Sequence, residues 1–202
     1  MYLVCCLSAL ALLPSCQGSP SPRKQDEGER TATPASIGPA AIEVHDAKGA
    51  VTAKVTAELP CRASVDGIKL VVGARPVVAT VGGTQWTGHD DNGGTLIKRD
   101  GEPVARIAPS TNALGVFDPN GIGIVRAMLA DDTAPGTARV VSGRGVVLRT
   151  ATRTPSGIAV GDRTVTGTDD LLLAAVLAAP EARPEVRALA ACLRVVPGDK
   201  VL

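Results

Sequence analysis

Apolar and polar residues alternate along much of the chain from residue 41 onward. Ile42-Glu43-Val44-His45 alternates, and the run from Val51 to Leu59 alternates again before Pro60. A two-residue period puts every second side chain on one face of a half-buried β-strand. Shorter apolar runs follow at 65–72 and 76–81. The pattern therefore predicts a succession of short strands.

Tight-turn dipeptides separate the apolar runs that follow. Asp66-Gly67 lies inside the run 65–72, Asp100-Gly101 follows the run 95–99, and Asn120-Gly121 precedes the run 122–128. Asp-Gly and Asn-Gly suit two-residue hairpin turns, because both central residues of such a turn need positive φ. We therefore expect antiparallel β-hairpins arranged as a meander.

The period of the pattern changes after Gly167. Thr168 or Asp169 is expected to cap a short helix over 171–178, which is apolar on all sides and should be buried. Pro184 suits the first turn of a second helix. One side of that helix carries a stripe with helical spacing, formed by Val186, Leu189, Ala190 and Leu193. A C-terminal helical pair over about 168–195 makes the predicted fold class α+β, mainly β.

Composition restricts the function more than it defines it. The formal net charge is +1, so the chain has no overall bias towards nucleic acid. Aromatic residues are 1% of the chain. The core must therefore be built from Val, Ile, Leu and Ala, and a platform of stacked rings for bases or sugars is not expected.

The first sixteen residues have the features of an export signal. Residues 2–13 are uncharged and almost wholly apolar, and the stretch is too short to span a bilayer as a helix. It ends in Leu13-Pro14-Ser15-Cys16, which resembles the lipobox of bacterial lipoproteins. The resemblance implies cleavage before Cys16, a diacylglycerol on its sulfur and a further acyl chain, such as palmitate, on its amine. The alternatives are an ordinary signal peptide and a short buried apolar segment.

The remainder of the chain divides at about residue 40. Residues 16–40 are rich in Pro, Ser and mixed charge, a composition typical of a flexible linker. We therefore expect a signal peptide at 1–15, a lipid-anchored linker at 16–40 and one β-rich globular domain at 41–202. Gln17, instead of Asp, after the cysteine resembles lipoproteins that are sorted to the outer membrane.

Two cysteines remain once the signal and the lipidated residue are set aside. Cys61 and Cys192 lie in the expected domain, and two thiols in an exported protein favour a disulfide. The alternative is two separately buried free cysteines, which behave as small apolar residues.

Residues with catalytic or metal-binding potential are sparse. The segment from Trp86 to Gly94 contains His89-Asp90-Asp91-Asn92, which we interpret as a polar loop with an Asn92-Gly93 turn because it lacks the ligand spacing of a calcium or zinc site. No serine lies in a Gly-x-Ser-x-Gly elbow, and His45 and His89 are the only histidines. The sequence predicts no metal, no cofactor and no enzyme.

One basic pattern suggests a contact surface. Arg149 and Arg153 share a strand face by their spacing, and this face could contact a polyanion or an acidic lipid. The alternative is a plain solvated face. The predicted function is a lipid-anchored protein of the cell envelope, on either face of the outer membrane, with a structural or interaction role. Its partners would be the membrane and an envelope protein or polymer. The alternatives are a carrier or binding protein for a small apolar or envelope-derived ligand, and an envelope hydrolase.

Overall fold

Fourteen β-strands and two α-helices form the part of the chain that the computed structural model describes, namely residues 41–73, 77–130 and 136–195. The predicted signal peptide at 1–15 and linker at 16–40 lie outside these residues. The strands are β1 (Ala41–His45), β2 (Val51–Thr56), β3 (Cys61–Val65), β4 (Ile68–Val72), β5 (Val77–Val81), β6 (Thr84–Asp91), β7 (Gly94–Arg99), β8 (Glu102–Pro109), β9 (Ala113–Phe117), β10 (Gly123–Leu129), β11 (Thr137–Ser142), β12 (Val147–Thr154), β13 (Gly157–Val160) and β14 (Arg163–Thr166). The helices are α1 (Leu171–Leu177) and α2 (Pro184–Val195).

The strands make one antiparallel sheet that follows the order of the chain almost throughout. From one end to the other the order is β4-β3-β2-β1-β14-β13-β12-β11-β10-β9-β8-β7-β6-β5. The pairing of β1 with β14 is the one place among the described strands where partners are distant in sequence. The prediction of a mainly β fold with hairpins in a meander and two C-terminal helices is therefore confirmed.

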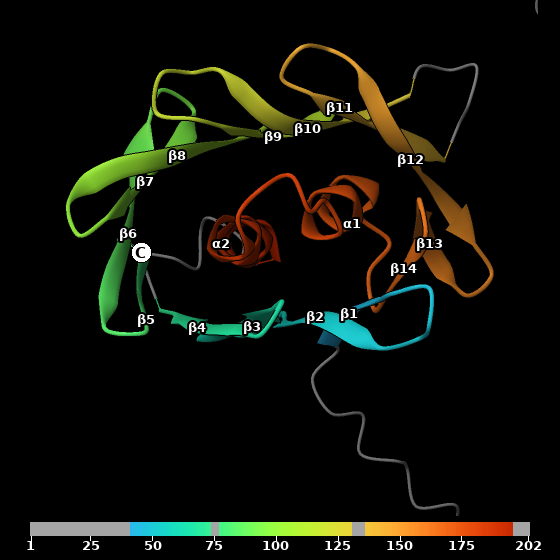
Figure 1. Cartoon of the computed structure of the whole chain (residues 1–202), viewed down its shortest axis with the longest axis horizontal. Helices are drawn as coiled ribbons and strands as arrows, with labels where there is room; N and C mark the ends of the chain where they lie inside the picture. Colours follow the sequence, from blue (N-terminus) through green and yellow to red (C-terminus); the bar gives the residue numbers. More distant parts are fainter. Residues whose placement is uncertain (1–40, 74–76, 131–135, 196–202) are drawn as a thin grey trace, which may run out of the picture. The chain divides into compact units, whose positions relative to one another are not determined.

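The sheet curves around the two helices, which lie on its inner side (Figure 1). Helix α1 packs against β9 to β13, and α2 packs against β2, β3, β4 and β8. Strand residues that face the helices are buried and small or branched, such as Val44, Val55 and Val116. The core therefore consists of a helical pair surrounded by one face of the sheet.

Hairpin turns with positive φ set the register of the strands. Asp66-Gly67, Asn92-Gly93 and Asp100-Gly101 have φ values of 46° and 82°, 42° and 77°, and 49° and 88°. Asp and Asn tolerate this left-handed region better than most residues, and Gly adopts it freely. These dipeptides join β3 to β4, β6 to β7 and β7 to β8, as expected of two-residue turns.

One expected loop is instead a strand. The sequence predicts a polar loop from Trp86 to Gly94, but β6 runs to Asp91 and, within this segment, only Asn92-Gly93 is a turn. Trp86 and Gly88 face the core, whereas Gln85 and His89 face outward. The expectation was wrong because the inward positions include a glycine, which hides the alternation of apolar and polar side chains in the sequence.

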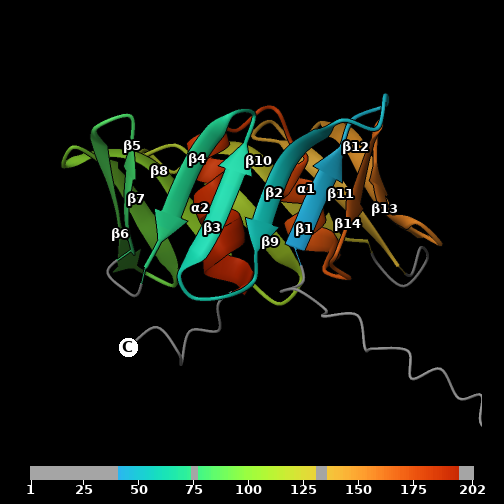
Figure 2. The same ribbon diagram turned by 90° about the horizontal axis from the view of Figure 1, so that it is seen from below.

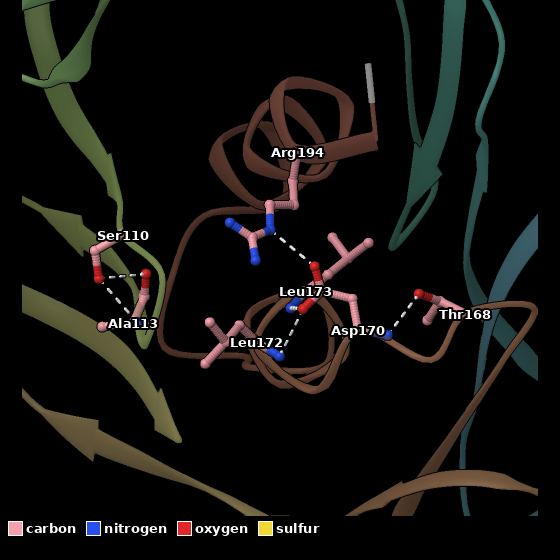
Figure 3. A network of polar contacts seen from close by, with 7 residues as sticks. All are labelled: Ser110, Ala113, Thr168, Asp170, Leu172, Leu173 and Arg194. Atoms are coloured by element: carbon pink, nitrogen blue, oxygen red, sulfur yellow. Dashed lines mark hydrogen bonds and ion pairs between the residues drawn. The ribbon is translucent and has the colours of Figure 1, made fainter. Parts of the chain in front are cut away.

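Helix α1 is buried along its whole length, as its composition predicts. Its N-cap is Asp170, which corrects the expectation of Thr168 or Asp169: the Asp170 carboxylate accepts hydrogen bonds from the backbone N–H groups of Leu172 and Leu173. Thr168 instead accepts a hydrogen bond from the backbone of Asp170 (Figure 3). The second Asp170 oxygen accepts from Arg194 of α2 at 2.8 Å, so this cap also joins the two helices.

Helix α2 is buried on more sides than its apolar stripe predicts. Val186, Leu189 and Ala190 of the stripe are buried, but Arg187 is buried as well. The reason is that the sheet surrounds this helix, with α1 on the remaining side, so α2 has little surface left for solvent (Figure 1).

Candidate functional site

The two cysteines of the domain form a disulfide. Cys61 at the start of β3 and Cys192 in α2 are both buried, with a Cα–Cα distance of 5.7 Å and an S–S distance of 2.00 Å. The predicted bridge is therefore confirmed, and it joins residues 131 positions apart. Because both cysteines are buried, one in β3 and the other in α2, the bridge is a structural connection between the sheet and the helix.

The two arginines singled out from the sequence differ in their surroundings. Arg149 of β12 forms a bidentate pair with Glu181 in the α1–α2 connection, at 2.8 and 2.5 Å. Burial raises the pKa of Glu181, but hydrogen bonds from Arg149 and from its own backbone outweigh burial, so this pKa lies below its ordinary value. Arg153 is exposed. Because Glu181 already balances the charge of Arg149, contact with a polyanion at this pair stays a prediction without support from its surroundings.

The two histidines lie on different strands that do not pair with each other. His45 ends β1, where its ring is 3.6 Å from Glu43, and His89 lies on the outer side of β6. Asp91 pairs with Arg106 of β8 at 3.1 Å. In the ranges that the structure describes, no group of three or more His, Cys, Asp or Glu side chains is arranged to hold a metal ion.

A groove lies on the outer side of β2, β3 and β4, the face turned to the viewer in Figure 2. Its volume is about 620 Å³. We call it the basic groove, and its polar lining consists of Lys54, Thr56, Arg62, Ser64, Lys69 and Thr80. Three of these side chains are cationic and three carry hydroxyls, and none of the described residues that line it carries a carboxylate.

Strand register brings the cations of the basic groove together. Lys54 pairs with Ser64 across β2 and β3, and Ser64 pairs with Lys69 across β3 and β4, so the three form one row. Arg62 lies on the same face two residues before Ser64, because alternate residues of a strand face the same way. A face with three cations from three neighbouring strands attracts an anionic group.

The cations of the basic groove differ in how far they are already neutralised. Lys54 donates a hydrogen bond to Glu43 of β1 at 2.7 Å, which lowers the pKa of Glu43. Arg62 and Lys69 form no ion pair with the described part of the chain. Arg62 of β3 and Lys69 of β4 are therefore available to a ligand. The cations repel a metal ion, and together with the hydroxyl donors they suit the groove to a carboxylate, phosphate or sulfate group.

Sequence reasoning missed the basic groove, although one signal for it was present. The Asp66-Gly67 turn fixes Ser64 opposite Lys69 and Arg62 opposite Val71. The register of β2 against β3 cannot be predicted in the same way. The connection at 57–60 between these strands is longer and has no diagnostic turn dipeptide. Lys54 thus joins the set only through the folded sheet.

Comparison with known proteins finds no matching family model, no matching curated protein and no matching solved structure. Among the residues that the structure describes, no helix has the length and apolar character needed to cross a membrane. The functional reading of this chain therefore depends on its own residues: the export-like segment at 1–16 and the basic groove.

Proposed function

We propose that this chain is a lipid-anchored protein of the cell envelope with a non-enzymatic interaction role, and that its domain binds an acidic envelope component through the basic groove. The segment Leu13-Pro14-Ser15-Cys16 supports the anchor, and residues 17–40 have the composition of a spacer between lipid and domain. The chain enters the described domain at Ala41, the start of β1.

The observation that carries this proposal is the row of cations on the outer face of β2, β3 and β4. Arg62 and Lys69 are cations that form no ion pair with the described residues. Lys54 forms an ion pair with the Glu43 carboxylate alone. The interior of the domain also favours binding at the surface. Helices α1 and α2 and their buried side chains occupy the space that an internal ligand of a carrier would need.

Replacement of Cys16 by serine is expected to release the protein from membranes. The acyl chains would be lost together with the sulfur, and each buried methylene contributes about 0.8 kcal/mol to membrane binding. Fractionation of cells that express the wild type or the Cys16→Ser variant, with labelling by a fatty-acid analogue, measures both effects. Labelling and membrane association that persist in the variant would rule out Cys16 as the anchor, whereas Cys61→Ser should leave the label unchanged.

Neutralising the basic groove is expected to abolish binding of the acidic partner. Each charge-assisted hydrogen bond is worth about 1.5–3 kcal/mol, so losing three should weaken binding by at least roughly a thousandfold. The variant is Lys54→Gln, Arg62→Gln and Lys69→Gln together. Crosslinking in intact cells, followed by quantification of the covalent complexes, compares it with the wild type.

The matched control removes three exposed cations from other parts of the surface. Lys48→Gln, Arg126→Gln and Arg139→Gln together change the net charge by the same amount, because each variant neutralises three cations. All three control side chains are exposed. We expect this control to form the same complexes as the wild type. Equal loss in both triple variants would mean that net charge governs binding, and no loss in the groove variant would refute the groove as the site.

A further inference from the structure

Large apolar side chains are exposed on two neighbouring hairpin turns at one end of the strands. Ile122 in the β9–β10 turn exposes 64% of its surface, and Val146 and Val147 at the β11–β12 turn expose 59% and 53%. Leu148 of β12 is also exposed. We call Ile122, Val146, Val147 and Leu148 the apolar tips. Single exposed apolar side chains are ordinary on a protein surface, but a group of them indicates an interaction site.

Two glycines bring these hairpin turns into contact. Strands β10 and β11 pair, with Val125 opposite Ser142 at this end of the ladder. Beyond that pair, a Cβ on Gly123 would lie 3.1 Å from the Cα of Gly143, and a Cβ on Gly143 would collide with the carbonyl oxygen of Gly123. The two turns pack directly against each other because neither position carries a side chain. The apolar tips therefore lie on adjoining turns.

The backbone of both turns is hydrogen-bonded within the turn. In the first turn, the Asp118 side chain accepts hydrogen bonds from two backbone N–H groups, at 2.9 and 2.8 Å, and its carbonyl accepts a third at 3.0 Å. In the second turn, the hydroxyl and the carbonyl of Ser142 accept from Val146 and Gly145, at 3.2 and 2.9 Å. Backbone groups without partners are costly away from water. Turns bonded in this way are suited to an apolar environment.

The geometry points to the surface of an anionic lipid bilayer as the partner of the apolar tips. Four half-exposed aliphatic side chains offer on the order of 200–400 Å² of apolar surface. A specific protein interface buries about 800 Å² on each partner, so the tips alone are too small for one. A bilayer needs no matching shape, and short apolar projections can enter the boundary between its headgroups and acyl chains.

The charge beside the apolar tips favours anionic headgroups. Arg144 lies in the β11–β12 turn, is exposed and forms no ion pair with the residues that the structure describes. The Asp118 carboxylate in the other turn already accepts two backbone hydrogen bonds. A cation beside inserted apolar side chains is attracted to the negative surface of such a bilayer. This inference goes beyond the proposed function, because it gives the domain a membrane contact separate from the basic groove.

The position of the apolar tips is compatible with the proposed lipid anchor. Antiparallel pairing of β1 with β14, β14 with β13 and β13 with β12 places the start of β12 at the opposite end from the start of β1, where the chain enters the domain. An eight-residue strand such as β12 spans about 27 Å. A linker of the length of 16–40 has a root-mean-square span of about 25–30 Å. Because the two lengths match, the anchor and the apolar tips can contact one bilayer.

A fluorescent label on the apolar tips tests this contact. Val146→Cys is labelled with nitrobenzoxadiazole in the full-length protein, whose native disulfide is buried, and the protein is reconstituted into vesicles of phosphatidylethanolamine and phosphatidylglycerol. We expect the emission to shift to shorter wavelength and to be quenched by lipids with a spin label on the acyl chain. Leu59→Cys is the matched control. Leu59 is exposed and follows the end of β2 that pairs with Ala41, so its label should show neither effect.

Acidic substitutions test whether the apolar side chains make the contact. Ile122→Asp with Val147→Asp in the labelled protein should abolish the wavelength shift and most of the lipid quenching, because carboxylates are costly in an apolar environment. Leu59→Asp with Leu129→Asp is the matched control, since both residues are exposed at the other end of the strands. It should leave both signals unchanged. The labelled protein without these substitutions keeps the test decisive if the tip variant fails to fold.

Each contrary outcome overturns the inference in a distinct way. A label at Val146 that iodide in solution quenches as strongly as the label at Leu59 would exclude any cover on the tips. Protection from iodide without quenching by the spin-labelled lipid would indicate a protein cover, such as a second copy of this chain. Equal lipid quenching in vesicles of phosphatidylcholine alone would refute the anionic class of lipid.

The triple groove variant separates this inference from the proposed function. We expect Lys54→Gln with Arg62→Gln and Lys69→Gln to leave the lipid quenching of the Val146 label unchanged, even though this variant should lose the acidic partner. Loss of quenching in the groove variant would overturn the inference, because the basic groove would then be the part that faces the bilayer. Failure of the groove to bind an acidic partner would refute the proposed function and leave the contact at the tips intact.

Discussion

Replacing Cys61 and Cys192 together by alanine is expected to lower the free energy of unfolding by up to about 5 kcal/mol. The bridge closes a loop of 131 residues, and the chain-entropy model gives this size of effect for a loop of that length. Residual structure in the unfolded chain reduces this stabilisation by the disulfide. A domain has a net stability of about 5–15 kcal/mol, so the double variant should be marginally stable.

Urea denaturation followed by circular dichroism measures this effect. The wild type in the presence of a reducing agent should unfold at the same lowered urea concentration as Cys61→Ala with Cys192→Ala, because both lack the bridge. The double variant itself should not respond to the reducing agent, which makes it the control. An unchanged urea midpoint for the double variant would contradict a stabilising bridge.

Substitution of Asp66 by asparagine is expected to destabilise the domain by roughly 2–3 kcal/mol. Arg187 of α2 is 2% exposed and pairs with Asp66, which is 39% exposed, and it also donates to the Leu177 carbonyl at 3.0 Å. Burial lowers the pKa of the Arg187 guanidinium, and the Asp66 carboxylate opposes that effect. Loss of one partner of a buried pair costs about 3–5 kcal/mol, and access of water to Asp66 places this pair below that range.

A double-mutant cycle isolates the pair from the turn in which Asp66 lies. Asparagine tolerates the positive φ of this position, so Asp66→Asn removes the charge and keeps the turn. Arg187→Met removes the charge and keeps an unbranched apolar side chain in the interior. Once Arg187 is Met, Asp66→Asn should cost much less than in the wild type, and urea midpoints of the four proteins measure the coupling. Additive effects would show that the two residues stabilise the domain independently.

Local features of the fold were predictable because local rules govern them. Asp66-Gly67 and Asp100-Gly101 form the expected hairpin turns, since few residues other than Asp, Asn and Gly reach positive φ cheaply. The fully apolar segment at Leu171–Leu177 is the expected buried helix. The pairing of Cys61 with Cys192 was predictable because these are the two cysteines of the expected domain, and the predicted export favours a disulfide.

The remaining features depend on the curvature of the sheet, which no local pattern records. Arg187 lies beside the apolar stripe of α2 and is expected at the surface of a helix that packs on one side only. It is buried because strands surround the helix. Trp86 lies in β6, where the inward-facing Gly88 hides the alternation of apolar and polar residues. The basic groove likewise needs the register of three strands before Lys54 and Lys69 are seen as neighbours.

The placement of the helices inside the sheet has a consequence for the order of events during synthesis. A ribosome makes the chain from the N-terminus, so all fourteen described strands emerge before Leu171, where the helical pair begins. Until that pair is made, no helix covers the inner face of the sheet. Cys61 also cannot form its disulfide, because Cys192 has not yet been synthesised. Hairpins can form one after another, but their apolar faces are fully buried only after the helical pair has been made.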